Sequence, residues 1–263
     1  MTDANDPSAT PTDTATEAFT MSSITGKLVL AMVRGQDYAH AGEEEAIELV
    51  LGPIPKMADA RLLDVGCGIG GTARYVETHG WGTVTGVDLD PANIAAANER
   101  HPGMDFVPSD AVLLAQAVPA HFDIIYSFNA FFLFNDQPAA LRAMRAVARP
   151  AGKLAIFDYV DLGGYVDSAK PRSTASARDA LRLDLIGATL EGSGWSLDQI
   201  VPAHTEYLRW YEALVGSIES KRDEIIAQSS EGFFDYVLER YTQTRDDIQA
   251  GRLGGATIYA AAT

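Results

Sequence analysis

Short apolar runs alternate with stretches of helical periodicity through the middle of the chain. Patterns typical of buried strands occur at residues 61–65, 83–90, 104–107, 122–127 and 153–159. Apolar residues with helical spacing occur between them, at residues 72–78, 91–99 and 137–148. Strands separated by helices over this length predict a parallel, doubly wound α/β sheet.

The pattern is more mixed after residue 160. A polar loop is expected over residues 161–178, because Gly, Ser, Asp and Pro dominate there. The remaining chain predicts a helix, a strand, two long amphipathic helices and a short last strand, at residues 180–190, 195–201, 206–226, 233–248 and 257–260. The expected fold class is a Rossmann-like, mostly parallel seven-stranded sheet with helices on both faces and a helical lid.

Composition shifts and periodicity divide the chain into four segments. Residues 1–20 are rich in Thr, Ala, Asp and Pro, lack periodicity and are expected to form a disordered tail. Residues 21–57 predict an N-terminal helical segment, and residues 58–160 predict the α/β core. Residues 161–263 complete the same domain with further helices and the last strands.

The net charge narrows the range of partners. Twenty Lys and Arg against 36 Asp and Glu give −16, which disfavours nucleic acid and anionic membrane surfaces. The apolar runs are too short to cross a bilayer, and the five His and one Cys lack metal-ligand spacing. The single cysteine and the lack of a secretion-signal pattern lead us to expect a cytoplasmic protein. Whether it forms a homo-oligomer is left open.

A glycine-rich turn follows the first predicted strand. Gly66, Gly68 and Gly70 let the backbone bend sharply and approach a ligand closely. Their spacing also satisfies the dinucleotide fingerprint, which leaves an NAD-linked oxidoreductase or a non-catalytic cofactor-binding protein as remote alternatives. Asp64 favours another ligand, because a carboxylate there repels a pyrophosphate and suits an ammonium or sulfonium group.

The second predicted strand ends in Asp88. A carboxylate at this position can accept hydrogen bonds from both ribose hydroxyls of a nucleoside cofactor, and Leu89 beside it suits the adenine. Capping of the next helix is the alternative role, and Asp90 is also placed for it.

Several motifs resemble those of the class I S-adenosylmethionine (SAM) methyltransferases. The run Leu-Asp-Val-Gly-Cys-Gly-Ile-Gly at residues 63–70 is similar to their first motif. Phe-Asp-Ile-Ile at 122–125 and Arg-Pro-Ala-Gly-Lys at 149–153 are similar to later ones, in the right order. The resemblance implies SAM as cofactor, held by Asp64, Gly66, Cys67, Gly68, Gly70, Asp88, Leu89, Asp110, Ala111 and Ser127. It also implies that residues 21–57 form a lid, that residues 58–160 form the SAM-binding core and that the helices of residues 161–263 lie on the substrate side.

Within that class the chain resembles the small-molecule N-methyltransferases of the phosphoethanolamine, glycine, sarcosine and dimethylglycine types. The resemblance rests on Tyr38, on Ile-Tyr-Ser at 125–127 and on Phe-Asp-Tyr at 157–159. The phosphoethanolamine type continues its fourth strand with Arg-Asp and then a histidine, whereas this chain has Phe128, Asn129 and Leu133. Its catalytic histidine is therefore absent, and its substrate cannot be carried over.

The resemblance implies catalytic roles near the methyl group for Tyr38, Asn129 and Tyr159. Candidate substrate-binding residues are His40, Asp158, Tyr207, Arg209, Trp210 and Tyr211. A capping role for His40, an exposed salt bridge for Arg209 and core packing for the aromatic residues are the plainer alternatives. We expect methylation of a small-molecule acceptor, with an amine favoured and an oxygen or carbon acceptor as the alternative.

Overall fold

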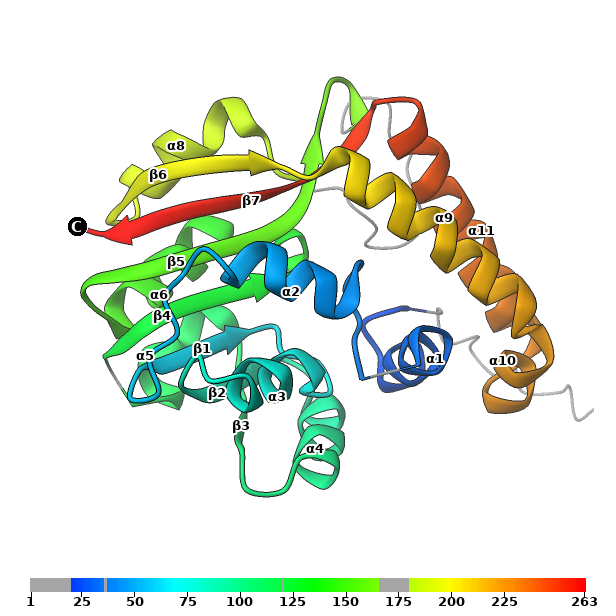
Figure 1. Cartoon of the computed structure of the whole chain (residues 1–263), viewed down its shortest axis with the longest axis horizontal. Coiled ribbons are helices and arrows are strands. Elements are labelled where there is room, and N and C mark those ends of the chain that lie inside the picture. The colour runs from blue at the N-terminus through cyan, green and yellow to red at the C-terminus, as the bar shows by residue number, and fades with distance from the viewer. Residues whose placement is uncertain (1–19, 36, 120, 166–179) are drawn as a thin grey trace, which may run out of the picture.

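The computed structural model describes residues 20–35, 37–119, 121–165 and 180–263 (Figure 1). The expected tail at 1–20 and the expected loop at 161–178 lie mostly outside the described residues. Seven strands form one sheet in the order β3-β2-β1-β4-β5-β7-β6. The first five are β1 (Arg61–Val65), β2 (Thr83–Asp88), β3 (Asp105–Pro108), β4 (Phe122–Phe128) and β5 (Ala148–Asp161).

These five strands pair in parallel, and of the remaining two only the last one in the chain runs against them. Strand β7 (Leu253–Ala262) pairs antiparallel with β5, from Lys153 opposite Ala261 to Asp161 opposite Leu253. Strand β6 (Trp195–Pro202) pairs antiparallel with β7 at the edge of the sheet. The predicted mostly parallel, seven-stranded sheet is confirmed.

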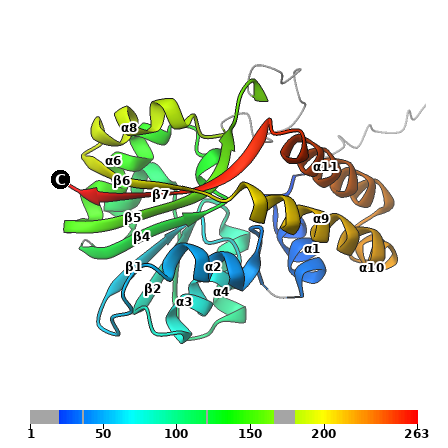
Figure 2. The same ribbon diagram turned by 45° about the horizontal axis from the view of Figure 1, so that its top comes forward.

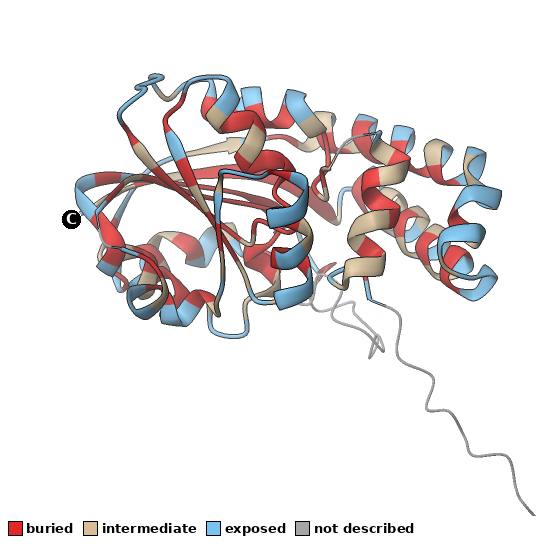
Figure 3. Ribbon diagram, turned by 90° about the horizontal axis from the view of Figure 1, so that it is seen from below, coloured by how far each residue is buried: buried red, intermediate tan, exposed pale blue. Residues whose placement is uncertain are grey.

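Helices cover both faces of the sheet. They are α1 (Ile24–Arg34), α2 (Glu43–Leu51), α3 (Gly71–Thr78), α4 (Pro91–Arg100), α5 (Leu114–Ala117), α6 (Gln137–Val147), α8 (Leu183–Glu191), α9 (His204–Ser220), α10 (Arg222–Gln228) and α11 (Glu231–Gln249). Successive strand residues point to opposite faces, so Ile124 joins one buried cluster and Ile125 the other. Figure 3 shows the resulting buried band between exposed outer helix faces. Among the described residues, no helix is long and apolar enough to cross a membrane.

Several predicted elements differ in extent from the structure. The fifth strand was expected at 153–159, whereas β5 begins at Ala148 and ends at Asp161. The long helix expected at 206–226 is interrupted at Lys221, between α9 and α10. The last strand is longer than residues 257–260, because β7 is hydrogen-bonded to β5 on one side and to β6 on the other.

Three helices that are far apart in the chain gather beyond the carboxyl ends of the parallel strands. Helix α9 contacts both α1 and α11, and Figures 1 and 2 show the three grouped at this end of the sheet. Ligands of open α/β sheets bind at this end.

Candidate cofactor and acceptor sites

The glycine turn between β1 and α3 has a backbone that other residues do not readily adopt. Gly66 and Gly70 both have φ of 86°, in the left-handed region. A Cβ at Gly66 would lie 2.3 Å from the Cβ of Ala130. The amides of Gly66 and Cys67 both donate to the carbonyl of Val87, at 2.7 and 3.0 Å, which ties the turn to the end of β2.

The Asp88 carboxylate organises the same turn from β2. Its Oδ2 accepts from the Gly68 amide at 2.9 Å. Its Oδ1 accepts from the Asp90 amide at 3.0 Å and from Asn93 Nδ2 at 3.1 Å. Asp90, not Asp88, caps α4, since its side chain accepts from the Ala92 amide. Because Asp90 caps the helix, Asp88 is available for a role in cofactor binding.

A hollow that we call the strand-end cavity opens between the glycine turn and the ends of β2 and β3. Its lining residues are Val65, Gly66, Val87, Asp88, Leu89, Ser109, Asp110, Ala111, Leu133, Phe134 and Asn135. Leu89 is 66% exposed, so it offers apolar surface that a flat ring can cover. Asp110 accepts from the Val112 amide at 3.1 Å, so it also caps the short 3-10 helix Ala111–Leu113.

Asp64 is buried beneath the turn, and its Oδ2 has no hydrogen-bond partner. Burial raises the pKa of this carboxyl, and the negative charge of Asp88 raises it further. A buried, unpaired carboxyl oxygen is unfavourable unless a ligand or water donates to it. Ser127 is satisfied within the sheet, because its hydroxyl donates to the Val65 carbonyl at 2.8 Å. Burial raises the pKa of the Cys67 thiol, which argues against a nucleophilic role.

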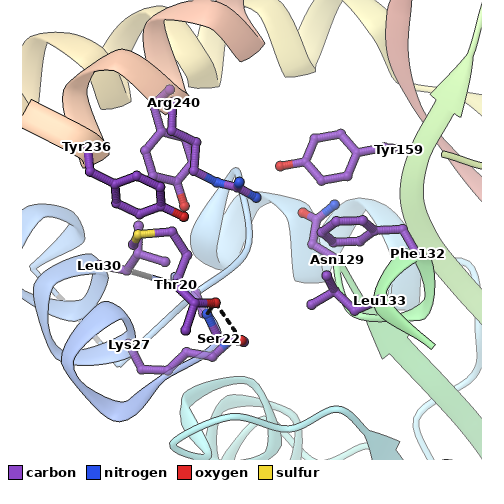
Figure 4. A pocket seen from close by; sticks show the side chains of 13 residues that line it. Thr20, Ser22, Lys27, Leu30, Asn129, Phe132, Leu133, Tyr159, Tyr236 and Arg240 are labelled. Carbon is purple, nitrogen blue, oxygen red and sulfur yellow. Dashed lines mark hydrogen bonds between the residues drawn. The ribbon is translucent and has the colours of Figure 1, made fainter. Parts of the chain in front are cut away.

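A second hollow, the tyrosine-lined pocket, lies beside the strand-end cavity and shares Leu133 with it. Figure 4 shows Tyr236 and Arg240 of α11 on one side and the strand residues Asn129 and Tyr159 on the other. The full lining is Thr20, Met21, Ser22, Lys27, Leu30, Ala39, Asn129, Phe132, Leu133, Tyr159, Tyr236, Arg240 and Tyr241.

Asn129 stands at the end of β4 with a left-handed backbone, φ 46°. Its Nδ2 donates to the Tyr207 hydroxyl at 2.8 Å, and its Oδ1 accepts from the Ala41 amide at 3.2 Å. The strained backbone and the two hydrogen bonds hold one amide orientation at the pocket wall.

Tyr159 lies next to it on β5, and its hydroxyl is hydrogen-bonded to that of Tyr211. Burial raises the pKa of Tyr159, and that of Tyr211 for the same reason, so both stay protonated at neutral pH. The Asp158 side chain does not line the pocket, and its carboxylate accepts from the amides of Phe132 at 2.9 Å and Tyr159 at 2.8 Å. Burial raises the pKa of Asp158 to about 7.

Seven of the 19 predicted site residues line one of the two hollows, and twelve line neither. Four of these twelve have hydrogen-bond or ion-pair partners away from the hollows. The Tyr38 hydroxyl donates to Glu44 at 3.3 Å. His40 is buried between the Ala41 carbonyl and the Thr72 hydroxyl, both 3.0 Å from its ring nitrogens. Trp210 donates to Glu45 at 3.0 Å, and Arg209 forms an exposed ion pair with the same carboxylate.

Two basic residues of the tyrosine-lined pocket were missed by the sequence reasoning. Arg240 follows Tyr236 by four positions on α11, a spacing that places both on one helix face. Lys27 comes from α1. Neither lies in a motif, so only their position on helices expected near the site could have drawn attention to them.

The chain is similar to known methyltransferases. Residues 63–156 match the family described as methyltransferase domain. The chain is 31% identical over 213 residues to the 27-O-demethylrifamycin SV methyltransferase of Amycolatopsis mediterranei, spanning 76% of this chain and 77% of that one. It is 27% identical to phosphoethanolamine N-methyltransferase 1 of Triticum aestivum, over 86% of this chain and 46% of the relative. The chain thus spans about half the length of that plant enzyme.

A solved structure gives the same picture of the fold. Phosphoethanolamine N-methyltransferase 2 of Haemonchus contortus, in complex with S-adenosyl-L-methionine, superposes with a TM-score of 0.78 at 21% identity, covering 91% of this chain and 57% of that one.

The site fits SAM chemically. Asp88 offers a carboxylate to a ribose, exposed Leu89 offers an apolar surface to an adenine, and the unpaired oxygen of Asp64 suits a positively charged amino-acid end. Among the described residues, no cluster of His, Cys, Asp and Glu could hold a metal ion. The sequence motifs, the seven-stranded sheet and the relatives agree, and the chain belongs to the class I SAM-dependent methyltransferases.

Proposed function

We propose that this protein methylates a small-molecule acceptor bound in the tyrosine-lined pocket, with an amine nitrogen as the favoured acceptor atom. The observation that carries the proposal is the pocket itself, which adjoins the strand-end cavity through Leu133. The sulfonium of SAM supplies the methyl group. The chain's own residues must hold the acceptor's lone pair in line with it and exclude water.

The titratable groups around the pocket favour nitrogen. A neutral amine needs orientation and desolvation, whereas an alcohol needs a positioned base. Burial raises the pKa values of Tyr159 and Tyr207, which makes them poor bases at neutral pH. The tyrosine rings suit the positive charge that develops on the nitrogen as it accepts the methyl group, and such cation–π contacts contribute ~1–2 kcal/mol when desolvated.

Arg240 suggests that the amine also carries an acidic group. Its guanidinium points into the pocket, toward the side where Asn129 and Tyr159 lie (Figure 4). It forms no ion pair with any residue in the described ranges, and the groups with the largest effect on its pKa are tyrosines. A carboxylate or phosphate on the acceptor would pair with it. The name of the plant relative, a phosphoethanolamine N-methyltransferase, is consistent with such an acceptor.

Methylation of an oxygen is the second candidate. The relative with 31% identity is named as a 27-O-demethylrifamycin SV methyltransferase. An alcohol acceptor would need the deprotonated Tyr159 as its base, and burial disfavours that form at neutral pH. This candidate therefore predicts activity that rises steeply at alkaline pH, and a Tyr159→Phe variant that loses nearly all activity together with this rise.

We also propose that residues 21–57 act as a lid. Lys27, Leu30 and Ala39 of this segment line the tyrosine-lined pocket opposite the strand ends. A cytoplasmic location remains an expectation from the sequence.

Calorimetric titration with SAM, its demethylated product and NAD tests the cofactor. We expect micromolar binding of the first two and none of NAD, and the reverse would contradict the proposal. Labelled SAM would then be offered with small amines, amines that carry a carboxylate or phosphate, and phenols. Labelling confined to phenols would replace the amine proposal with the oxygen alternative.

A further inference from the structure

Lys27 of α1 lies across the glycine turn. A Cβ on Gly68 would stand 3.6 Å from Lys27 Cε and 3.8 Å from Nζ, so the side chain is in contact range of the turn's backbone. Lys27 also lines the tyrosine-lined pocket, and Figure 4 shows it on the α1 side, beside Ser22. Lys27 thus links the tyrosine-lined pocket to the glycine turn, whose first glycine, Gly66, lines the strand-end cavity.

The Lys27 ammonium lacks a partner in the described part of the chain. It takes part in none of the hydrogen bonds or ion pairs there. Burial lowers its pKa, while the negative charges of Asp88 and Asp90 raise it. Lys27 is half-buried, and a partly desolvated cation without a hydrogen-bonding partner is less favourable than a paired one, so an anionic group suits this place.

SAM carries one anionic group, the carboxylate of its amino-acid end. The acids beside the turn, Asp64 and Asp88, repel a carboxylate and attract the ammonium and sulfonium groups. We propose that Lys27 binds the carboxylate of SAM, so that α1 contributes to the cofactor site as well as to the lid. This inference rests on the proposed function, because it takes SAM as the ligand.

The test pairs a residue change with a ligand change. Wild type, Lys27→Met and Lys27→Arg are titrated calorimetrically with SAM and with decarboxylated SAM, which lacks only the carboxylate. Lys56→Met serves as the control, since Lys56 lies over the Trp81 ring, 3.7 Å from its centroid, away from both hollows.

We expect wild type to bind SAM about tenfold or more tightly than decarboxylated SAM, as a desolvated charged pair implies. In Lys27→Met this preference disappears, because SAM binding weakens while binding of the decarboxylated ligand changes little. Lys27→Arg retains most of the preference, and Lys56→Met matches wild type.

Two results would overturn the inference. Equal weakening of both ligands in Lys27→Met would mean that Lys27 only supports the fold of α1. Tighter SAM binding in that variant would mean that the ammonium competes with the cofactor. Failure of wild type to bind either ligand would instead refute the proposed function, and circular dichroism of each variant separates these outcomes from unfolding.

Discussion

Asn129 Nδ2 donates to the Tyr207 hydroxyl across 2.8 Å, joining the end of β4 to the first turn of α9. These residues are 78 positions apart in the chain. The contact places a side-chain amide at the pocket wall and tethers the helix that carries Tyr207 and Tyr211, whose rings contact that of the pocket residue Tyr159.

Replacing Asn129 separates its side-chain role from its backbone role. Both Asn129→Ala and Asn129→Gly remove the amide, so we expect kcat to fall about tenfold to a hundredfold in each. Alanine must also adopt φ 46°, whereas glycine does so freely. The alanine variant should therefore unfold at lower denaturant, by about 1 kcal/mol relative to the glycine variant. Unchanged kcat in both would remove Asn129 from the proposed catalytic group.

Replacing Asp88 tests the ribose role. Asp88→Ala removes the carboxylate that also holds the Gly68 amide and Asn93, and Asp88→Asn keeps the shape while losing the charge. We expect at least about tenfold weaker SAM binding in both variants, and a larger loss in the alanine variant. Calorimetry measures the change, and an unaltered affinity in Asp88→Ala would exclude the ribose role.

Arg240 can be tested with Arg209 as the matched control. In Arg240→Met we expect KM to rise about tenfold or more for amines with a carboxylate or phosphate, and to stay constant for neutral analogues. Arg209→Met should leave both unchanged, because Arg209 is exposed and paired with Glu45 outside the pocket. The measurement is the steady-state KM of each variant for an acidic acceptor and for its neutral analogue. An equal rise for both acceptor types would assign Arg240 to the structure of α11.

The buried His40 predicts a pH dependence of stability. Burial lowers its pKa from 6.5 to about 3. Between these values the unfolded chain binds the proton and the folded chain does not, so stability falls as the pH falls through this window. From pH 7 to pH 4 the loss from His40 is about 3 kcal/mol.

The measurement is urea unfolding of wild type and His40→Gln at both pH values. Between pH 7 and pH 4, His40→Gln should lose about 3 kcal/mol less free energy of unfolding than the wild type. Asp158 acts in the opposite direction, because its raised pKa makes the folded state bind the proton up to about pH 7. Its contribution is common to both proteins and cancels in the comparison, so equal losses would show that His40 is not held neutral.

Gly66 and Gly251 form a second matched pair. Both have positive φ, 86° and 68°. A Cβ at Gly251 meets nothing within 4 Å, whereas one at Gly66 meets the Cβ of Ala130 at 2.3 Å. We expect Gly251→Ala to cost about 1 kcal/mol of stability and Gly66→Ala a further ~2 kcal/mol.

Adding Ala130→Gly to Gly66→Ala removes the clashing atom and should restore part of this difference. Thermal unfolding compares the variants. If Ala130→Gly restores no stability, the contact with Ala130 is not the reason why alanine at position 66 is destabilising.

The sequence by itself determined the elements that local patterns encode. The first strand was predicted at 61–65, and β1 has the same bounds. The start of α4 followed from Asp90 and Pro91, since a capping side chain and a proline act on the nearest helix turn. The glycine turn could also be predicted from the sequence, because a backbone with φ near 86° is rarely adopted by residues other than glycine.

Only the tertiary structure decided which helices reach the site. Lys27 and Arg240 lie on α1 and α11 at opposite ends of the chain, yet both line one pocket with Asn129. Periodicity shows which face of a helix is buried and not what it is buried against. For that reason the sequence indicated Arg209 as a candidate substrate-binding residue and did not indicate Arg240. Packing places Arg209 beside Glu45 at the surface and Arg240 in the pocket.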